Sequence, residues 1–393
     1  MDKRKKEIFV AMSGGVDSSV VAALLKEQGH NVTGIFMRNW SDSHCTAEED
    51  HSDVARICKQ IDIPYYAVNF EKEYADHVFA DFLEQSRQGF TPNPDILCNR
   101  EIKFKLLFQT AKKYGADLLA TGHYAQISPF SSLLSHNLTP ENSAISSLIP
   151  EQKPLCLAKG KDRSKDQSYF LYQINPSVLS QTLFPLGHLE KKQVREMALR
   201  MGLVTATKKD STGICFIGKR NFREFLSGYL PIQPGNMIDV QGNVLGQHQG
   251  IAFYTIGQRK GLGIGGAGQA WFVVDKDPSN NQLLVAQGTG GAGFDECPAL
   301  FSRSCTVLPP HWLVAQLQEH FTSQDNSSLR CMAKIRYRSQ DTACTLIKED
   351  GHYHVLFDSS QRAVTPGQSI VFYHNAFCLG GAFIQSRSRE NLP

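Results

Sequence analysis

The order of strand-like and helix-like segments predicts a doubly wound α/β domain with a parallel sheet, followed by a small α+β central domain and a C-terminal β-barrel. In the first 120 residues, apolar stretches typical of buried strands alternate with segments whose apolar residues recur with helical spacing. Beyond residue 220 the pattern changes to short strands with Gly-based turns, and from about residue 295 to closely spaced alternating strands. We therefore expect three units, which comprise residues 1–219, 220–290 and 291–385.

Each unit is predicted from particular segments. The expected strands of the first unit are 7–12, 32–37, 65–69 and 117–121, and its expected helices are 17–29, 47–61, 71–88 and 100–114. In such a fold, ligands bind outside the carboxyl ends of the parallel strands. Residues 128–153 are rich in Ser, Pro and Asn and lack periodicity, which predicts a surface insertion. In the central unit, "DVQGNVLGQ" and "FVVDKDPSNNQLLVAQG" are typical of hairpins.

Composition and charge narrow the class of protein. The 393 residues contain no apolar run as long as a membrane span, and the start "MDKRKKEIFV" has no apolar signal region, so we expect a cytoplasmic protein. In that compartment, structural disulfides are not expected among the ten cysteines. Residues 153–223 contain fourteen Lys and Arg against five Asp and Glu, although the whole chain has a formal net charge of only +3. This local excess favours a polyanionic partner such as nucleic acid.

The segment "VAMSGGVDSSVVAALL" is expected to connect the first strand to the first helix. The first N–H groups of a helix and its dipole favour an anion, and Gly14 and Gly15 allow close approach of the backbone. A Walker A loop is excluded because Val16 and Asp17 stand where that motif requires Lys and Ser or Thr. A carboxylate beside phosphates is typical of a site with a divalent cation between them. A glycine-rich turn with an ordinary helix cap is the alternative.

Two cysteines are expected in loops rather than on apolar periodic faces. Cys98 lies in "TPNPDILCNREIKF", where two prolines predict an irregular loop before a helix that begins near Arg100. Cys215 lies between two basic pairs in "KKDSTGICFIGKR". A thiol close to a helix start or to basic side chains has a lowered pKa, so both are candidate reactive cysteines.

Several motifs carry a resemblance to known families. The segment Ser-Gly-Gly-x-Asp-Ser-Ser resembles the PP-loop of ATP pyrophosphatases. Taken together, "AMSGGVDSSV", "TPNPDILCNREIKF", "ATGHYA", "KDQSYFL", "DSTGICFIG", "YTIGQRKGLGI" and "KIRYR" resemble, in content and order, the bacterial tRNA-specific 2-thiouridylases. The resemblance covers nearly the whole chain except the insertion. It implies ATP-dependent adenylation of the C2 oxygen of the wobble uridine, followed by sulfur transfer.

The resemblance also implies roles for individual residues. Asn93, Pro94 and Asp95 would contact the target base, with Asp95 as general acid/base. Cys215 would carry a persulfide obtained from a sulfur-carrier protein or cysteine desulfurase, and Cys98 would be the second catalytic thiol, so that the two end as a transient disulfide. ATP binding is implied for Ala11, Met12, Ser13, Gly14, Gly15, Val16, Asp17, Ser18, Met37 and Gly122, with Mg²⁺ on the phosphates near Asp17. Contacts with tRNA are implied for His123, Asp166, Gln167, Ser168, Arg336, Tyr337 and Gln368.

Two other functions remain open on the residues alone. A PP-loop ligase acting on a small molecule would need neither the paired cysteines nor the basic segment. A tRNA-binding protein could sense a nucleotide without consuming it. The release of AMP with and without tRNA distinguishes all three.

Overall fold

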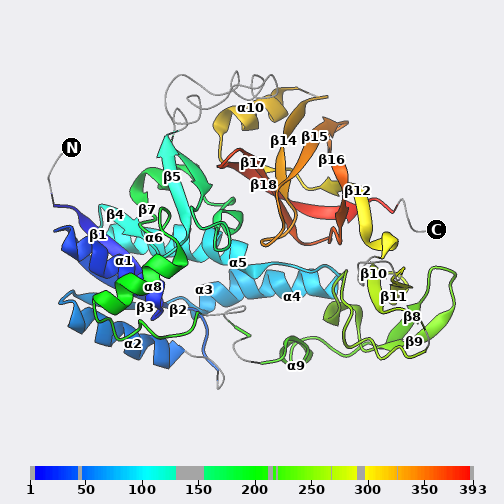
Figure 1. Cartoon of the computed structure of the whole chain (residues 1–393), viewed down its shortest axis with the longest axis horizontal. Helices are drawn as coiled ribbons and strands as arrows, with labels where there is room; N and C mark the ends of the chain where they lie inside the picture. Colours follow the sequence, from blue (N-terminus) through cyan, green and yellow to red (C-terminus); the bar gives the residue numbers. More distant parts are fainter. Residues whose placement is uncertain are drawn as a thin grey trace.

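The computed structural model describes residues 5–42, 47–129, 155–210, 216–217, 220–266, 268–289, 297–324 and 326–389. Figure 1 shows the α/β unit with its helices beside a β-rich half that holds the central sheet and the barrel. The predicted insertion 128–153 lies almost entirely outside the described residues. No helix in the described ranges is both long enough and apolar enough to cross a membrane.

The first unit is built on a parallel sheet, as predicted. Among the described residues its strand order is β3-β2-β1-β4-β7, and every neighbouring pair is parallel. Side chains alternate across β1, so that Ile8 and Val10 join one apolar cluster while Phe9 joins another on the opposite face. The strands are β1 (Glu7–Met12), β2 (Asn31–Arg38), β3 (Tyr65–Asn69), β4 (Leu118–Ala120) and β7 (Thr182–Leu183).

Helices cover both faces of this sheet. The cluster around Ile8 and Val10 contains side chains of α1, α2 and α8, and the cluster around Phe9 contains side chains of the helical segments between residues 71 and 113. The helical segments of the first unit are α1 (Val16–Glu27), α2 (Ala47–Gln60), α3 (Glu71–Tyr74), η1 (Ala75–Phe79), α4 (Ala80–Arg87), α5 (Pro94–Leu97), η2 (Cys98–Leu107), α6 (Phe108–Lys113), η4 (Ser168–Phe170), η5 (Pro176–Gln181) and α8 (Lys191–Arg200).

The central unit contains the two predicted hairpins. In it, β8 (Gly235–Ile238) pairs with β9 (Val244–His248), and β10 (Trp271–Asp277) pairs with β11 (Gln282–Gln287). A parallel pairing of β8 with β11 joins the hairpins into one sheet. The short helices α9 (Phe222–Ser227) and η6 (Ile251–Phe253) complete this unit.

The C-terminal unit is a closed barrel. Its described strands pair in the order β12-β16-β15-β14-β17-β18, and β12 also pairs with β18, which closes the ring. The hairpin of β5 (Ala125–Pro129) and β6 (Leu155–Lys159) extends from the first unit to the edge of β18. The elements of the barrel are η7 (Pro298–Leu300), β12 (Phe301–Val307), β13 (His311–Trp312), α10 (Ala315–Ser323), β14 (Ser328–Lys334), β15 (Thr342–Glu349), β16 (His352–Arg362), β17 (Ser369–His374) and β18 (Phe377–Arg387).

The loop before α5 touches both β-rich units. Lys276 of the central unit donates hydrogen bonds to Gly89 O at 2.9 Å and Thr91 Oγ1 at 3.3 Å. From the barrel, Gln368 Nε2 donates to Thr91 O at 2.6 Å, and Pro366 O accepts from Thr91 N at 3.0 Å. All three units therefore hold this one loop in place.

Candidate active site

The loop between β1 and α1 has the geometry of an anion site. Gly14 has a φ of +70°, and a Cβ there would lie 2.6 Å from the backbone oxygen of Asp50, so only glycine fits. Gly15 is the N-cap of α1 and gives it no side-chain cap. Ser13 N donates to Ser18 Oγ at 3.2 Å, which draws the loop over the helix start. The first N–H groups of α1 therefore lack a competing side-chain cap, as phosphate binding requires.

Asp17, in the first turn of α1, lies in a network of charged side chains. Its carboxylate accepts hydrogen bonds from Lys191 Nζ at 2.7 and 2.8 Å and from the Tyr124 hydroxyl at 2.8 Å. Lys191 also pairs with Asp210 at 2.9 Å, and Lys165 pairs with the same carboxylate at 2.9 Å. Burial raises the pKa of Asp210, but hydrogen bonds from Lys165 and Lys191 and their positive charges lower it to about 2.

Sequence reasoning missed two lysines at this loop. Lys191 begins α8, and Lys208 Nζ donates to Gly14 O at 3.1 Å while it pairs with Asp50 and Asp53 at 2.8 and 2.6 Å. Their partners at the loop and on α2 lie more than 150 residues away in sequence, so no local pattern links these lysines to the loop. Their position gives the loop two positive charges beside the expected phosphates.

The other residues expected to bind ATP lie at the same edge of the sheet. Ala11 and Met12 end β1 and pair with Ile35 and Phe36 of β2, and half-buried Met37 follows in β2. Gly122 follows β4 and lies against the start of α1, because a Cβ there would be 3.1 Å from Asp17 Cβ and 3.2 Å from Ser18 N. Residues more than 100 positions apart thus meet at the loop.

The expected base-binding residues begin a helix. Asn93 is the N-cap of α5, with its side-chain oxygen accepting from Asp95 N at 3.2 Å, and Pro94 occupies the first helical turn. Burial raises the pKa of Asp95, and the positive charge of Lys103 opposes this. Burial and the same Lys103 charge hold the pKa of His123 well below its ordinary value. The His123 ring also lies 5.8 Å from that of Phe104, between centroids, and Phe104 shares an apolar cluster with Ile96, the neighbour of Asp95.

Cys98 does not lie in a loop, contrary to the prediction from the sequence. It is 3% exposed and lies in the unbroken run of α5, η2 and α6, because Asn93 and Pro94 start the helix six residues before Arg100. The guanidinium of Arg100 donates to Glu101 and Gln173.

Cys215 lies outside the described residues, so its distance from Cys98 stays a prediction. Its neighbour Phe216 is buried in the apolar cluster that also contains Cys98. The Phe216 ring lies 5.0 Å from that of Phe79 and 5.1 Å from that of Phe82, between centroids. The chain next to Cys215 therefore belongs to the same core as Cys98.

The residues expected to touch tRNA have varied surroundings, and their roles stay predictions. Asp166 and Ser168 are buried, and Asp166 Oδ1 accepts from Gly160 N at 3.0 Å and Ser168 N at 3.1 Å. Gln167 Oε1 accepts from Tyr124 N at 3.0 Å. The half-buried Tyr337 ring lies 4.5 Å from that of Phe170. Arg336 donates to Ile256 O in the central unit and to Ala363 O in the barrel, and Gln368 donates to Thr91 O.

Part of the basic segment 153–223 is neutralised within the protein. Lys165, Lys191 and Arg195 all pair with Asp210, and Lys208 and Arg220 pair with acidic residues of the first unit. Lys161, in contrast, is exposed. The charge excess in the sequence therefore overstates the positive surface that this segment presents.

Comparison with known proteins identifies the family. Residues 6–219 match a family model described as a tRNA methyl transferase HUP domain, residues 223–287 a tRNA methyl transferase PRC-barrel domain, and residues 302–384 an aminomethyltransferase beta-barrel domain. The protein named tRNA-specific 2-thiouridylase MnmA from Alkaliphilus oremlandii is 50% identical, over 98% of this chain and 99% of that protein. The protein of the same name from Shouchella clausii is 48% identical over 100% of both chains. The one from Bacillus subtilis is also 48% identical, over 98% of this chain and 96% of that protein. With this identity along its whole length, the chain belongs to the tRNA-specific 2-thiouridylase family.

Proposed function

We propose that the protein is a cytoplasmic tRNA-uridine 2-sulfurtransferase, which uses ATP to convert the wobble uridine of tRNA to 2-thiouridine and releases AMP and pyrophosphate. Family membership supports the activity. The observation that carries the proposal is the tripeptide Gly122-His123-Tyr124, which connects the expected ATP loop with the expected base site. We retain the division into residues 1–219, 220–290 and 291–385 as a prediction.

Each residue of this tripeptide serves a different part of the site. Gly122 lies against Asp17, and the Tyr124 hydroxyl donates to the Asp17 carboxylate at 2.8 Å. Between them, the His123 ring lies 5.8 Å from that of Phe104, between centroids, and Phe104 shares an apolar cluster with Ile96, the neighbour of Asp95. An ATP on the loop and a base beside Asp95 would therefore lie on two sides of one short segment. Adenylation requires this closeness, because the base oxygen must reach the α-phosphate.

The first step is adenylation of the base. Bases in an anticodon loop can be unstacked and held by their edges, and the capped turn at residues 93–95 would hold the wobble uridine in this way. The C2 oxygen attacks the α-phosphate of ATP, and pyrophosphate leaves toward the first N–H groups of α1. Asp95, whose pKa is raised by burial, would act as general acid/base, accepting a proton from the uracil base and returning one to it. Lys191 and Lys208 would stabilise the departing negative charge.

Magnesium fits this site through one or two carboxylates and the phosphates. No group of three or more His, Cys, Asp or Glu side chains in the described ranges could hold a metal ion alone. Asp17 and Asp210, however, both pair with the ammonium of Lys191, so two carboxylates already face one positive charge. Mg²⁺ is commonly held by one or two carboxylates together with substrate phosphates. When bound, it would neutralise phosphate charge.

The second step is sulfur transfer. The terminal sulfur of a Cys215 persulfide attacks C2 of the adenylated uridine, and AMP leaves with the former C2 oxygen. The Cys98 thiolate attacks the sulfur of Cys215, which breaks the persulfide bond and leaves a Cys98–Cys215 disulfide. Each turnover thus consumes one persulfide from a donor protein and requires a reductant to restore the thiols.

Product analysis with purified protein tests this proposal. We expect AMP release to depend on tRNA and to match the 2-thiouridine formed, as measured by mass spectrometry of digested tRNA. A small-molecule ligase would release AMP without tRNA when given its substrate, and a nucleotide-sensing RNA-binding protein would release none. Either result in the presence of a persulfide donor contradicts the proposal.

A further inference from the structure

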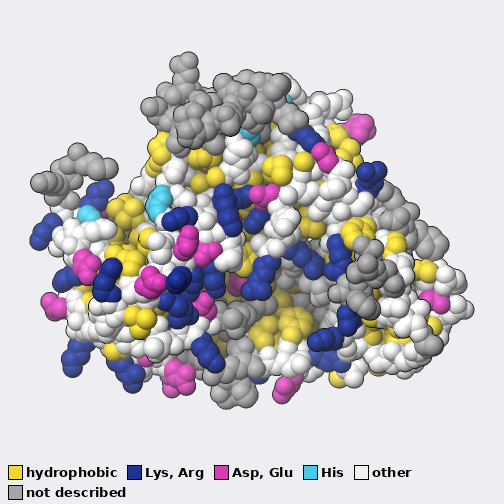
Figure 2. All heavy atoms as spheres, in the orientation of Figure 1, with side chains coloured by type: hydrophobic (Ala, Val, Ile, Leu, Met, Phe, Trp, Pro, Cys, Tyr) yellow, Lys and Arg dark blue, Asp and Glu magenta, His cyan; other side chains and the backbone are white. Residues whose placement is uncertain are grey.

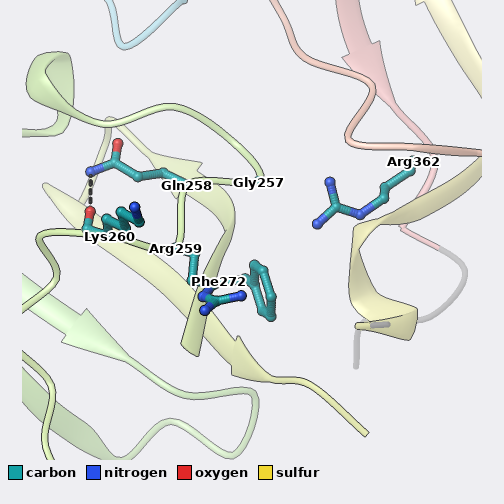
Figure 3. A pocket seen from close by; sticks show the side chains of 6 residues that line it. All are labelled: Gly257, Gln258, Arg259, Lys260, Phe272 and Arg362. Carbon is teal, nitrogen blue, oxygen red and sulfur yellow. Dashed lines mark hydrogen bonds between the residues drawn. The ribbon is translucent and has the colours of Figure 1, made fainter. Parts of the chain in front are cut away.

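A cavity of about 570 Å³ lies where the central unit meets the barrel (Figure 3). One wall consists of the turn 257–260 and Phe272, and the other wall contributes Arg362, the last residue of β16. Arg259, Lys260 and Arg362 make the described lining positive, and none of the described lining residues is acidic. The turn belongs to the segment "YTIGQRKGLGI", which the proposed function leaves without a role.

The turn is fixed by its own hydrogen bonds. The Gln258 side chain accepts from Thr255 N at 3.1 Å and donates to Lys260 O at 3.0 Å. The backbone of residues 257 and 258 also pairs with Val273 of β10, at 2.8 and 2.9 Å. The backbone that carries exposed Arg259 and Lys260 is therefore fixed in advance, so little backbone entropy is lost when these side chains bind a ligand.

Arg336 fixes the two walls relative to each other. Its Nη2 donates to Ile256 O at 3.1 Å beside the turn, and to Ala363 O at 2.9 Å beside Arg362. Gly257, with a φ of +90°, lies so close to the opposite wall that a Cβ there would be 3.2 Å from Ala363 Cβ. The cavity is therefore a built feature of the interface.

We propose that this cavity binds a phosphodiester of the tRNA backbone, through Arg259 and Arg362 on its opposite walls. This inference rests on the proposed function. Figure 3 shows the Arg259 guanidinium beside Phe272, with the guanidinium of Arg362 directed toward them across the cavity. Phe272 is only 1% exposed, so it cannot stack on a base. Arg362 Cζ lies 5.7 Å from the centroid of the Phe272 ring. Guanidinium groups form charge-assisted hydrogen bonds with phosphate oxygens, and positive side chains on both walls favour a phosphodiester because it carries a negative charge that a base lacks.

One RNA can reach both this cavity and the base site. Arg362 is six residues from Gln368, which donates to the loop before residues 93–95, and six residues span at most roughly 21 Å. Figure 2 shows Lys and Arg side chains gathered across the middle of the face in view, between the α/β unit and the β-rich half. The cavity and the base site are thus close enough for one polyanion to contact both.

Binding measurements with surface variants test the proposal. We expect Arg259→Ala and Arg362→Ala each to raise the Kd for full-length tRNA about fivefold to tenfold, and to reduce the slope of log Kd against log salt by about one. Arg362→Lys keeps the charge and should restore the slope but only part of the affinity. The matched control is Arg56→Ala, whose side chain is exposed on α2 in the first unit. Thermal unfolding and ATP affinity should match wild type in every variant.

Two results would overturn the inference. One is a wild-type Kd and salt slope in the double variant Arg259→Ala/Arg362→Ala. The other is lost affinity for inorganic phosphate or ATP with unchanged tRNA binding, which would make the cavity a small-anion site. In both cases, wild-type protein and Arg56→Ala would still thiolate tRNA if the proposed function holds. Failure of the wild type to thiolate would instead refute the proposed function.

Discussion

Asp17→Asn separates the chemical role of the ATP loop from its structural role. The change keeps the shape of the side chain but removes the charge that pairs with Lys191 at 2.7 and 2.8 Å. At an effective dielectric constant of 20, two unit charges about 4 Å apart attract by about 4 kcal/mol before desolvation. The net cost is smaller, because Asp17 is partly exposed and Lys191 keeps Asp210 as a partner. We expect a loss of about 1–2 kcal/mol in the free energy of unfolding.

The expected effect on catalysis is larger than this loss. If Asp17 acts on the phosphates through a cation, its neutral variant should form AMP about 100-fold more slowly, which corresponds to about 2.7 kcal/mol. Single-turnover AMP formation by the persulfide-loaded protein with ATP and tRNA measures this, and the tRNA Kd should not change. Asp341→Asn is the matched control, because Asp341 pairs with Lys159 at 2.5 Å in the barrel, away from the loop. AMP formation by Asp17→Asn within about threefold of wild type would show that Asp17 only supports the fold.

Two further predictions concern Lys276 and Asp210. Lys276→Met removes the hydrogen bonds to Gly89 and Thr91 that hold the loop before the base site. We therefore expect kcat/KM for tRNA to fall about tenfold while the KM for ATP is unchanged, and equal losses for both substrates would contradict this. The pKa of Asp210 is lowered to about 2, so its roughly 2 kcal/mol of stabilisation should be complete above pH 4 and lost as the pH falls from about 4 to 2. The free energy of unfolding, measured with urea at pH 5 and pH 3, should therefore change less with pH for Asp210→Asn than for wild type. An equal change in both proteins would refute a stabilising role of the Asp210 carboxylate.

The α/β unit was predictable because its signals are local. Buried strands such as Ile8-Phe9-Val10 and helices with one apolar face differ in period, and the glycines at residues 14 and 15 mark the turn between the first pair. The closed barrel was predictable from alternation over short spacings. Both predictions depend on neighbours within about ten residues.

The surroundings of Cys98 were predicted wrongly for an identifiable reason. Two prolines were interpreted as signs of a loop, but Pro94 occupies the first turn of a helix capped by Asn93, where proline is favoured. The helix therefore begins earlier and buries the cysteine. Asn93-Pro94-Asp95 before Ile96 and Leu97 thus begins a helix, with an N-cap, a proline and an acidic residue in the first turn.

The charged network of the site could not be predicted from the sequence. Lys191 reaches Asp17 across 174 residues, and Lys208 reaches Asp50 across 158. Side chains this far apart meet only through the packing of α8 and the following loop against α1 and α2. For the same reason, the basic character of residues 153–223 did not reveal which lysines are paired within the protein.

The most direct test of the proposed mechanism is peptide mapping of the protein after one turnover without reductant. The protein is first loaded by a persulfide donor, then mixed with ATP and tRNA, and the cysteine peptides are identified by mass spectrometry. We expect the persulfide on Cys215 before the reaction and a Cys98–Cys215 disulfide after it, in an amount equal to the 2-thiouridine formed. Cys98→Ser should accept the persulfide but fail at turnover, and Cys215→Ser should still adenylate the base and release pyrophosphate but form no 2-thiouridine. A persulfide on Cys98, or full thiolation by either serine variant, would contradict the two-cysteine mechanism.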